Sequence, residues 1–152
     1  MAEIAITQVM QFHSDAVEDG DLQITKLEGE EAINKPYEFR LELASTKPDI
    51  EHADLLKKPA WIGIKQGIQL AGQDKRAATT LKIHGAIQSF EQVGKELELV
   101  KYRAVLVPKL QRLSLQHQSR IFQNQKIPDI IKTICDEHSV EVDMSKLGSS
   151  CR

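Results

Sequence analysis

The sequence contains only two cysteines in 152 residues, Cys135 and Cys151. Small domains that are held together by disulfides carry more cysteines, so the chain does not belong to that class. A free cysteine is commonly buried and behaves as a small hydrophobic side chain. We therefore expect Cys135, which falls on the apolar face of a predicted helix, to serve in packing.

Long hydrophobic runs are also missing. No window of the sequence approaches the roughly 20 apolar residues that a membrane-spanning helix requires. Residues 1–21 lack the basic region, the apolar stretch and the small-residue cleavage pattern of a signal peptide. The sequence thus predicts a protein without a membrane segment or a signal peptide, made and folded in the cytoplasm.

Neither sign of charge is in large excess. The formal net charge is −2, and charged residues of both signs are mixed along the chain. Such a chain has no global basic field, which excludes binding of nucleic acid by bulk electrostatic attraction. With 41% hydrophobic and 28% charged residues, the composition is that of a soluble globular protein long enough to bury a core.

Motifs of enzymes and metal sites are not found either. The chain has no G-x-S-x-G, no H-E-x-x-H and no phosphate-binding glycine loop. Cys135 and His138 stand three residues apart on the predicted helix, but two ligands do not make a zinc site. Most carboxylates alternate with apolar residues, which is typical of a solvated sheet face. We therefore expect no enzymatic activity, no metal and no cofactor.

Alternation of apolar and charged residues predicts a mainly β protein. It is clearest in YEFRLEL, residues 37–43, which has the period of a half-buried strand. Residues 28–31 predict a turn, residues 50–56 a helical turn, and residues 66–79 an exposed loop. Several short strands with turns between them are typical of a small barrel or sandwich. The predicted strands are residues 22–27, 37–43, 60–65, 81–90 and 97–107.

Two irregularities are expected within these strands. Gly85 interrupts the fourth strand, and an isolated glycine there indicates a bulge or a tight bend. In the fifth strand the apolar positions change parity between Leu99 and Tyr102. A bulge near Val100 and Lys101 would reconcile the two halves.

A single α-helix is predicted near the C-terminal end, over residues 127–138. Pro128 suits its first position, and Asp129 suits the positive end of the helix dipole. Residues 140–144 are interpreted as the start of another strand. The apolar stripe of the helix consists of Ile127, Ile130, Ile131, Ile134, Cys135 and His138.

Aromatic residues make up only 5% of the chain and stand singly. Tyr37, Phe39 and Tyr102 fall in phase with the apolar positions, so we interpret them as packing residues. A barrel of the OB type that binds single strands would instead expose aromatic side chains beside Lys or Arg. An OB-like module that binds oligosaccharide or single-stranded nucleic acid therefore stays as the alternative function.

The phrase SRIFQ, residues 119–123, is followed by a spacer and by IPDII, which opens the helix. This arrangement strongly resembles the VgrG family, also called Rhs-element Vgr proteins, the spike proteins of the bacterial type VI secretion system. The match continues upstream in register and covers residues from about 8 to about 140. The family-motif residues are Gly29, Glu30, Pro36, Tyr37, Phe39, Leu55, Leu56, Gly85, Tyr102, Pro108, Ser119, Arg120, Ile121, Phe122, Gln123, Ile130 and Ile131.

The resemblance implies a small antiparallel β-barrel over residues 1–110, like the baseplate hub of contractile phages. Residues 111–152 would then be a junction with the amphipathic helix, at the start of an incomplete second segment. The implied role is structural. In the family, a trimeric hub caps the Hcp tube, carries the puncturing needle and effectors, and leaves the cell through the type VI apparatus.

The chain also departs from the family. Lys57 stands where a glycine is common, and Arg112 stands near a frequent tryptophan. Family members continue into the rest of the hub and a β-helical needle, so we expect this chain to be an N-terminal fragment or the product of a truncated gene. The helix stripe should then be partly exposed. A fragment of a phage baseplate hub, with the same fold, is a further alternative.

Overall fold

The computed structural model describes residues 10–48, 50–56, 58–66 and 79–145. Most of the predicted loop at 66–79, together with Lys57 and Cys151, lies outside the described residues. The chain forms two compact units, Met1–Pro108 (unit 1) and Lys109–Arg152 (unit 2).

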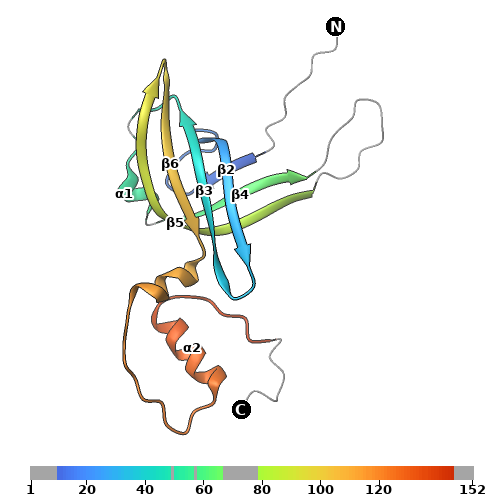
Figure 1. Ribbon diagram of the computed structural model, residues 1–152, viewed down its shortest axis with the longest axis vertical. Helices are drawn as coiled ribbons and strands as arrows, with labels where there is room; N and C mark the ends of the chain where they lie inside the picture. The colour runs from blue at the N-terminus through green and yellow to red at the C-terminus, as the bar shows by residue number, and fades with distance from the viewer. Residues whose placement is uncertain (1–9, 49, 57, 67–78, 146–152) are drawn as a thin grey trace. The chain divides into compact units, whose positions relative to one another are not determined.

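Unit 1 is built from one six-stranded antiparallel sheet with the strand order β1-β4-β5-β6-β3-β2 (Figure 1). A mainly β protein was predicted and is confirmed. The first strand was not predicted, and the second is longer than expected. The strands are β1 (Met10–Ser14), β2 (Gln23–Ala32), β3 (Lys35–Ser45), β4 (Pro59–Gln66), β5 (Thr79–Glu96) and β6 (Leu99–Val107).

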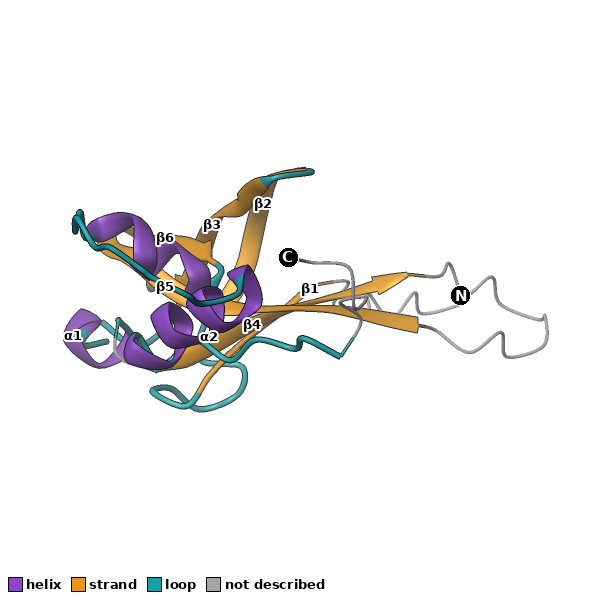
Figure 2. Cartoon of the chain, turned by 90° about the horizontal axis from the view of Figure 1, so that it is seen from below, coloured by secondary structure: helices purple, strands orange, loops and turns teal. Residues whose placement is uncertain are grey.

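The sheet curls into a half-barrel because β5 takes part in both of its sides. The first part of β5 pairs with β4 and the second part with β6, and Ala86 is paired with both Pro59 and Val107. Figure 2 shows β2 and β3 on one side of the fold, with β1 and β4 on the other. The outer strands β1 and β2 approach each other. This curled sheet confirms the predicted antiparallel, barrel-like fold.

The core of unit 1 follows the alternation seen in the sequence. On β3, Leu41 and Leu43 point inward and are completely buried, whereas Arg40 and Glu42 face out. Inward-facing residues of β1, β4, β5 and β6 pack against them, and so does α1 (His52–Leu55), the predicted helical turn. The buried aliphatic side chains at the centre are Leu41, Leu43, Leu55, Ile62, Val100 and Leu106.

The turn predicted at residues 28–31 is wrong, because these residues continue β2. Gly29 pairs with Phe39 across the hairpin, and a Cβ atom at Gly29 would lie 2.0 Å from Cδ1 of Phe39. The phenyl ring thus occupies the space that a side chain would need. Glycine serves here to admit a ring from the neighbouring strand, so it does not mark a turn.

The bulge predicted near Val100 and Lys101 is also wrong. From Val100 to Leu106, β6 pairs with β3 without a shift of register. The register shifts lie in β5 instead, between Ile87 and Ser89 and between Gln92 and Gly94. The apolar positions changed parity in the sequence because Leu97 was counted as part of the strand. In the structure Leu97 lies in the turn before β6, with a φ of 55°.

Unit 2 consists of a 3₁₀ helix, η1 (Lys109–Leu115), an extended segment, and α2 (Ile127–Glu137). The predicted helix is confirmed and begins at Ile127, so Pro128 takes the second position rather than the first. Proline is tolerated there because the first N–H groups of a helix have no intrahelical acceptor. Residues 140–144 form no strand, contrary to the interpretation of the sequence.

Candidate functional site

The family-motif residues of β2 and β3 form the first of three contact groups in unit 1. Gly29 lies beneath Phe39, and the rings of Tyr37 and Phe39 are 5.6 Å apart and tilted by 52°. Glu30 faces Glu38 across the hairpin, near Pro36. The Phe39 ring thus packs directly on the backbone of Gly29, the residue that faces it in the hairpin.

A second group joins β3 to β5. The hydroxyl of Tyr37 donates a hydrogen bond to the carbonyl oxygen of His84, next to Gly85. Desolvation by burial raises the pKa of the Tyr37 phenol, and the nearby Glu31 carboxylate raises it further. A Cβ atom at Gly85 would lie 2.4 Å from the carbonyl oxygen of Val107, so glycine permits close approach of β5 and β6. Gly85 is thus the point where the backbones of β5 and β6 come close together. The nearest register shift in β5 lies further along the strand, between Ile87 and Ser89.

The third group fixes the segment that follows β3. Tyr102 is buried in β6, and its hydroxyl lies 3.0 Å from each of the carbonyl oxygens of Lys47 and Pro48. The Tyr102 ring stacks on Phe90 at 5.1 Å, with planes 15° apart. The tyrosine therefore packs within the core, as its phase in the sequence predicted.

The remaining motif residues of unit 1 differ in exposure. Leu55 in α1 is completely buried, whereas Leu56 just after it is exposed. Pro108 is half-buried at the end of β6, where unit 1 ends. The Leu-Leu pair therefore contributes one core residue and one surface residue.

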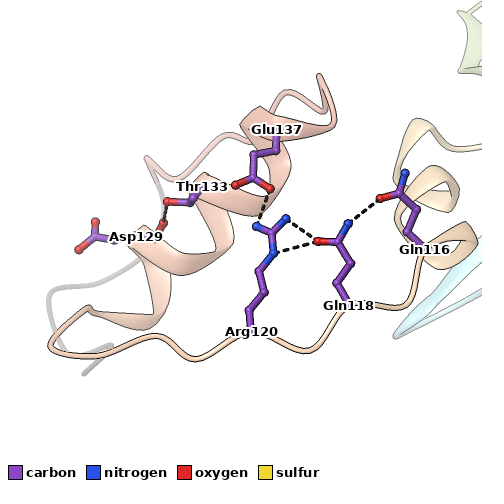
Figure 3. Close-up of polar contacts among 6 residues, drawn as sticks. All are labelled: Gln116, Gln118, Arg120, Asp129, Thr133 and Glu137. Carbon is purple, nitrogen blue, oxygen red and sulfur yellow. Dashed lines mark hydrogen bonds and ion pairs between the residues drawn. The ribbon is translucent and has the colours of Figure 1, made fainter.

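Arg120 is the centre of the motif segment in unit 2 (Figure 3). Its Nη1 donates to Oε2 of Glu137 at 2.6 Å, and its Nε donates to Oε1 of Gln118 at 2.9 Å. Glu137 is the last residue of α2, where the helix dipole disfavours a carboxylate. The guanidinium of Arg120 offsets that cost and ties residues 118–120 to the end of the helix.

The other motif residues in unit 2 are mostly on its surface. Ser119 and Gln123 are exposed, Phe122 is half-buried, and Ile121 is 88% exposed. Of the helix pair, Ile130 is half-buried and Ile131 is 42% exposed. Arg120 links the SRIFQ segment to α2 through its ion pair with Glu137.

Unit 2 leaves much apolar side-chain area uncovered. Within α2, Cys135 is buried, as predicted, and Val140 just beyond the helix is buried too, but Ile127 is 55% exposed. Partial exposure of the helix stripe was expected and is confirmed. The large exposed aliphatic residues of unit 2 are Leu110, Leu115, Ile121, Ile127, Ile131 and Val142.

The described residues show no sign of a catalytic centre. No group of three or more His, Cys, Asp or Glu side chains is placed to hold a metal ion in the part of the chain that the structure describes, and Cys135 and His138 form no site with further ligands there. Among the described helices, none has the length and apolar character to cross a bilayer. The lysine and glutamate pKa shifts arise at exposed ion pairs such as Lys26–Glu28 and Lys101–Glu96. Exposed ion pairs of this kind contribute little to the free energy of folding, and they do not indicate a catalytic group.

Sequence reasoning found the motif residues but missed their partners. Glu137 was not singled out, although a carboxylate in the last turn of a predicted helix indicates that a cation should lie nearby. The hydroxyl of Tyr102 lies within hydrogen-bond distance of the backbone carbonyl oxygens of Lys47 and Pro48. The sequence gives no sign of these acceptors, because every residue has a backbone carbonyl group.

The family model of the phage tail baseplate hub (GPD) matches residues 30–149 of this chain. The type VI secretion system spike protein VgrG4b of Pseudomonas aeruginosa is 32% identical over 136 residues, which are 88% of this chain and 15% of that protein. VgrG5 of the same organism is 33% identical over 123 residues, 81% of this chain and 14% of that protein. The predicted resemblance to VgrG spike proteins is thereby confirmed.

Two further similarities concern a toxin and a solved structure. The actin cross-linking toxin VgrG1 of Vibrio cholerae is 29% identical over 143 residues, 88% of this chain and 12% of the toxin. The solved structure is the E. coli c3393 protein, a component of the type VI secretion system with structural similarity to the T4 tail proteins gp27 and gp5. It has a TM-score of 0.65 and 22% identity, and the match covers 84% of this chain and 32% of that one. The chain therefore spans only about a seventh of the curated relatives that it matches.

Proposed function

We propose that this chain, which belongs to the phage tail baseplate hub (GPD) family, acts as a hub module of a type VI secretion spike. The observation that carries the proposal is the extent of the family match. It runs from β2 through α2 and so includes both units. The VgrG relatives VgrG4b and VgrG5 match 88% and 81% of this chain, and the chain shares its fold with a structure likened to phage tail proteins.

The proposed role within the spike is structural. In this proposal unit 1 corresponds to the first hub barrel, over residues 1–110, and residues 111–152 lead through α2 toward a second barrel. Three such subunits would form the ring that caps the Hcp tube. The uncovered aliphatic side chains of unit 2 support this, because they are suited to packing against a second barrel or a neighbouring subunit.

The proposal assigns no enzymatic activity to this chain. The matched part is 12% of the actin cross-linking toxin, so the similarity leaves most of that toxin uncompared. Three of the family-motif residues, Phe39, Tyr102 and Arg120, pack or hydrogen-bond within the fold. We infer a protein made in the cytoplasm that leaves with the spike, needs no cofactor and connects to effectors through other parts of a longer hub.

The test is association with purified hexameric Hcp, measured by light scattering that resolves the mass of each species. We expect a species heavier than the Hcp hexamer when this chain, or a full-length hub trimer that contains it, is added. Failure of both to associate would overturn the proposed function. Binding of single-stranded DNA that weakens steeply with added salt, without binding of Hcp, would favour an OB-like module instead.

A further inference from the structure

The connection between β1 and β2 crosses the open side of the half-barrel. These two strands are the outer edges of the sheet, and the segment that joins them runs from Asp15 to Leu22. Ala16 and Val17 pack partly against the core, and Leu22 is buried in it. We call residues 15–21 the strap, because they span the gap between the two edges without being part of the sheet.

The strap is acidic and is folded on itself. It contains Asp15, Glu18, Asp19 and Asp21, but no lysine or arginine. The amide of Val17 donates to the carbonyl of Ser14 at 3.2 Å, and the amide of Asp21 donates to that of Glu18 at 3.1 Å. Four carboxylates in seven residues repel one another, so the folded strap requires positive partners.

Lys47 is the partner at the β2 end of the strap. Its ammonium lies 2.8 Å from Oδ2 of Asp21 and 3.6 Å from Oε2 of Glu18. The hydrogen bond to Asp21 raises the pKa of Lys47, so this anchor is charged at every pH near neutrality. The carbonyl of Lys47 receives the hydroxyl of Tyr102 at 3.0 Å, which fixes the lysine backbone to the core.

His13 is the partner at the β1 end. Its Nδ1 contacts Oδ1 of Asp19, and its Nε2 lies 3.6 Å from Oδ1 of Asp15. The imidazole stacks on Trp61 of β4, with centroids 5.0 Å apart and planes at 26°. The contact to Asp19 is a hydrogen bond that a neutral imidazole can also make, whereas the contact to Asp15 is within ion-pair distance only. The positive charge of an imidazolium is attracted to both carboxylates, so the protonated ring is the form that binds the strap through both of them.

Two basic side chains also lie around this contact. Lys82 of β5 lies over the Trp61 ring, with Nζ 4.4 Å from its centroid, and His84 lies 6.3 Å from Trp61, centroid to centroid. The ammonium of Lys82 repels a positive charge at His13, whereas the carboxylates of Asp15 and Asp19 attract it. The two carboxylates are in direct contact with the imidazole, whereas Lys82 and His84 are in contact with the indole.

We propose that the strap closes the open side of the half-barrel and that proton uptake by His13 tightens its β1 end while Lys47 holds its β2 end. The lysine anchor carries its charge throughout, and the histidine anchor gains a charge only when its imidazole binds a proton. This inference concerns the fold of unit 1 and does not depend on the proposed function.

Trp61 is the only tryptophan of the chain, so its fluorescence reports on the ring stacked against it. A protonated imidazole in contact with an indole quenches its emission. The intact chain should therefore lose intensity as the pH falls from about 8 to about 5. His13→Gln should remove this transition, and His84→Gln, the matched control at the other neighbouring imidazole, should keep it. A transition that is missing in the unaltered chain, or that survives His13→Gln, would overturn the proposal.

Strap opening is measured separately, as hydrogen exchange at the amides of Val17 and Asp21, corrected for the intrinsic pH dependence of exchange. Opening should be about two- to five-fold greater at pH 8 than near pH 5.5, the range expected for an exposed charged contact. Asp19→Asn keeps the contact between His13 and Trp61, so it should retain the fluorescence transition but lose most of the pH dependence of opening. Opening that does not change with pH in the unaltered chain would also overturn the proposal.

Discussion

The two units of this protein bury their apolar residues to different degrees. In unit 1 the inward faces of five strands and α1 enclose a continuous core, at whose centre Leu41 and Leu106 are fully buried. Among the described residues of unit 2, Cys135 and Val140 are the buried ones, and Ile127 and Ile131 of the helix stripe remain exposed. Unit 1 therefore encloses a core of its own, whereas the helix of unit 2 leaves part of its apolar stripe in contact with solvent.

The largest effect expected from this difference concerns the core of unit 1. Leu41→Ala removes a completely buried side chain and leaves a cavity, which should reduce the free energy of unfolding by about 2–5 kcal/mol. Ile131→Ala, the matched truncation in unit 2, should cost less than about 1 kcal/mol, because this residue is already 42% exposed.

The measurement is urea denaturation followed by the fluorescence of Trp61 for unit 1 and by far-ultraviolet circular dichroism for the whole chain. Equal losses for Leu41→Ala and Ile131→Ala would contradict the comparison, because they would show that unit 2 has a core of its own.

A second prediction uses three glycines of unit 1. Gly85→Ala places a Cβ atom 2.4 Å from a backbone carbonyl of β6, so it should cost about 1–3 kcal/mol of unfolding free energy. Gly94→Ala is the matched control, because no atom lies within 4 Å of its added Cβ. Gly29→Ala should fall between them, since the Phe39 ring that it meets can shift. Thermal melts of the three variants give the order, and a loss at Gly94 as large as at Gly85 would refute the steric explanation.

The sequence correctly predicted the strand and the helix that show a regular repeat of apolar residues. The alternation in residues 37–43 and the stripe beginning at Ile127 depend on neighbours along the chain, and both elements formed. β1 was missed because its inward residues are Phe12 and Ser14, and a buried serine breaks the apolar pattern. The Ser14 hydroxyl accepts a hydrogen bond from the amide of Ala16 at 3.4 Å, a local contact that is typical of serine at a turn and that allows it to be buried.

Errors arose where a distant partner decides the structure. Gly29 continues a strand because Phe39 fills the space above it, and turn chemistry alone could not reveal this. Leu97 was read as part of a strand, but it lies at the hairpin tip and is 92% exposed. For the candidate site, the family phrase located Arg120, whereas its ion pair with Glu137, seventeen residues away, required the folded chain.

A third, smaller effect is expected in unit 2 at this ion pair. Arg120→Gln and Glu137→Gln, with the double variant, form a cycle whose coupling energy should be about 0.2–1 kcal/mol, because both side chains are more than a third exposed. Protection of the α2 amides from hydrogen exchange measures the coupling in unit 2 without interference from unit 1. A coupling that does not weaken with added salt would contradict the assignment of this contact as a screened surface pair.

The smallest effect should come from the exposed ion pairs of unit 1, and its sign follows from the pKa shifts. The hydrogen bond from Lys101 lowers the pKa of Glu96, so the stability contributed by this carboxylate is present above its unfolded pKa and is lost as pH falls through the folded value. The same pair raises the pKa of Lys101, so its contribution is present below the unfolded pKa of the lysine and is lost as pH rises through the folded value. Lys101→Gln should therefore flatten the melting temperature profile slightly at both extremes of pH. Since β6 is anchored by buried residues such as Tyr102 and Leu106, the change should stay well below that caused by Leu41→Ala. A larger change would mean that charge on the outer face, and not the enclosed core, distinguishes unit 1 from unit 2.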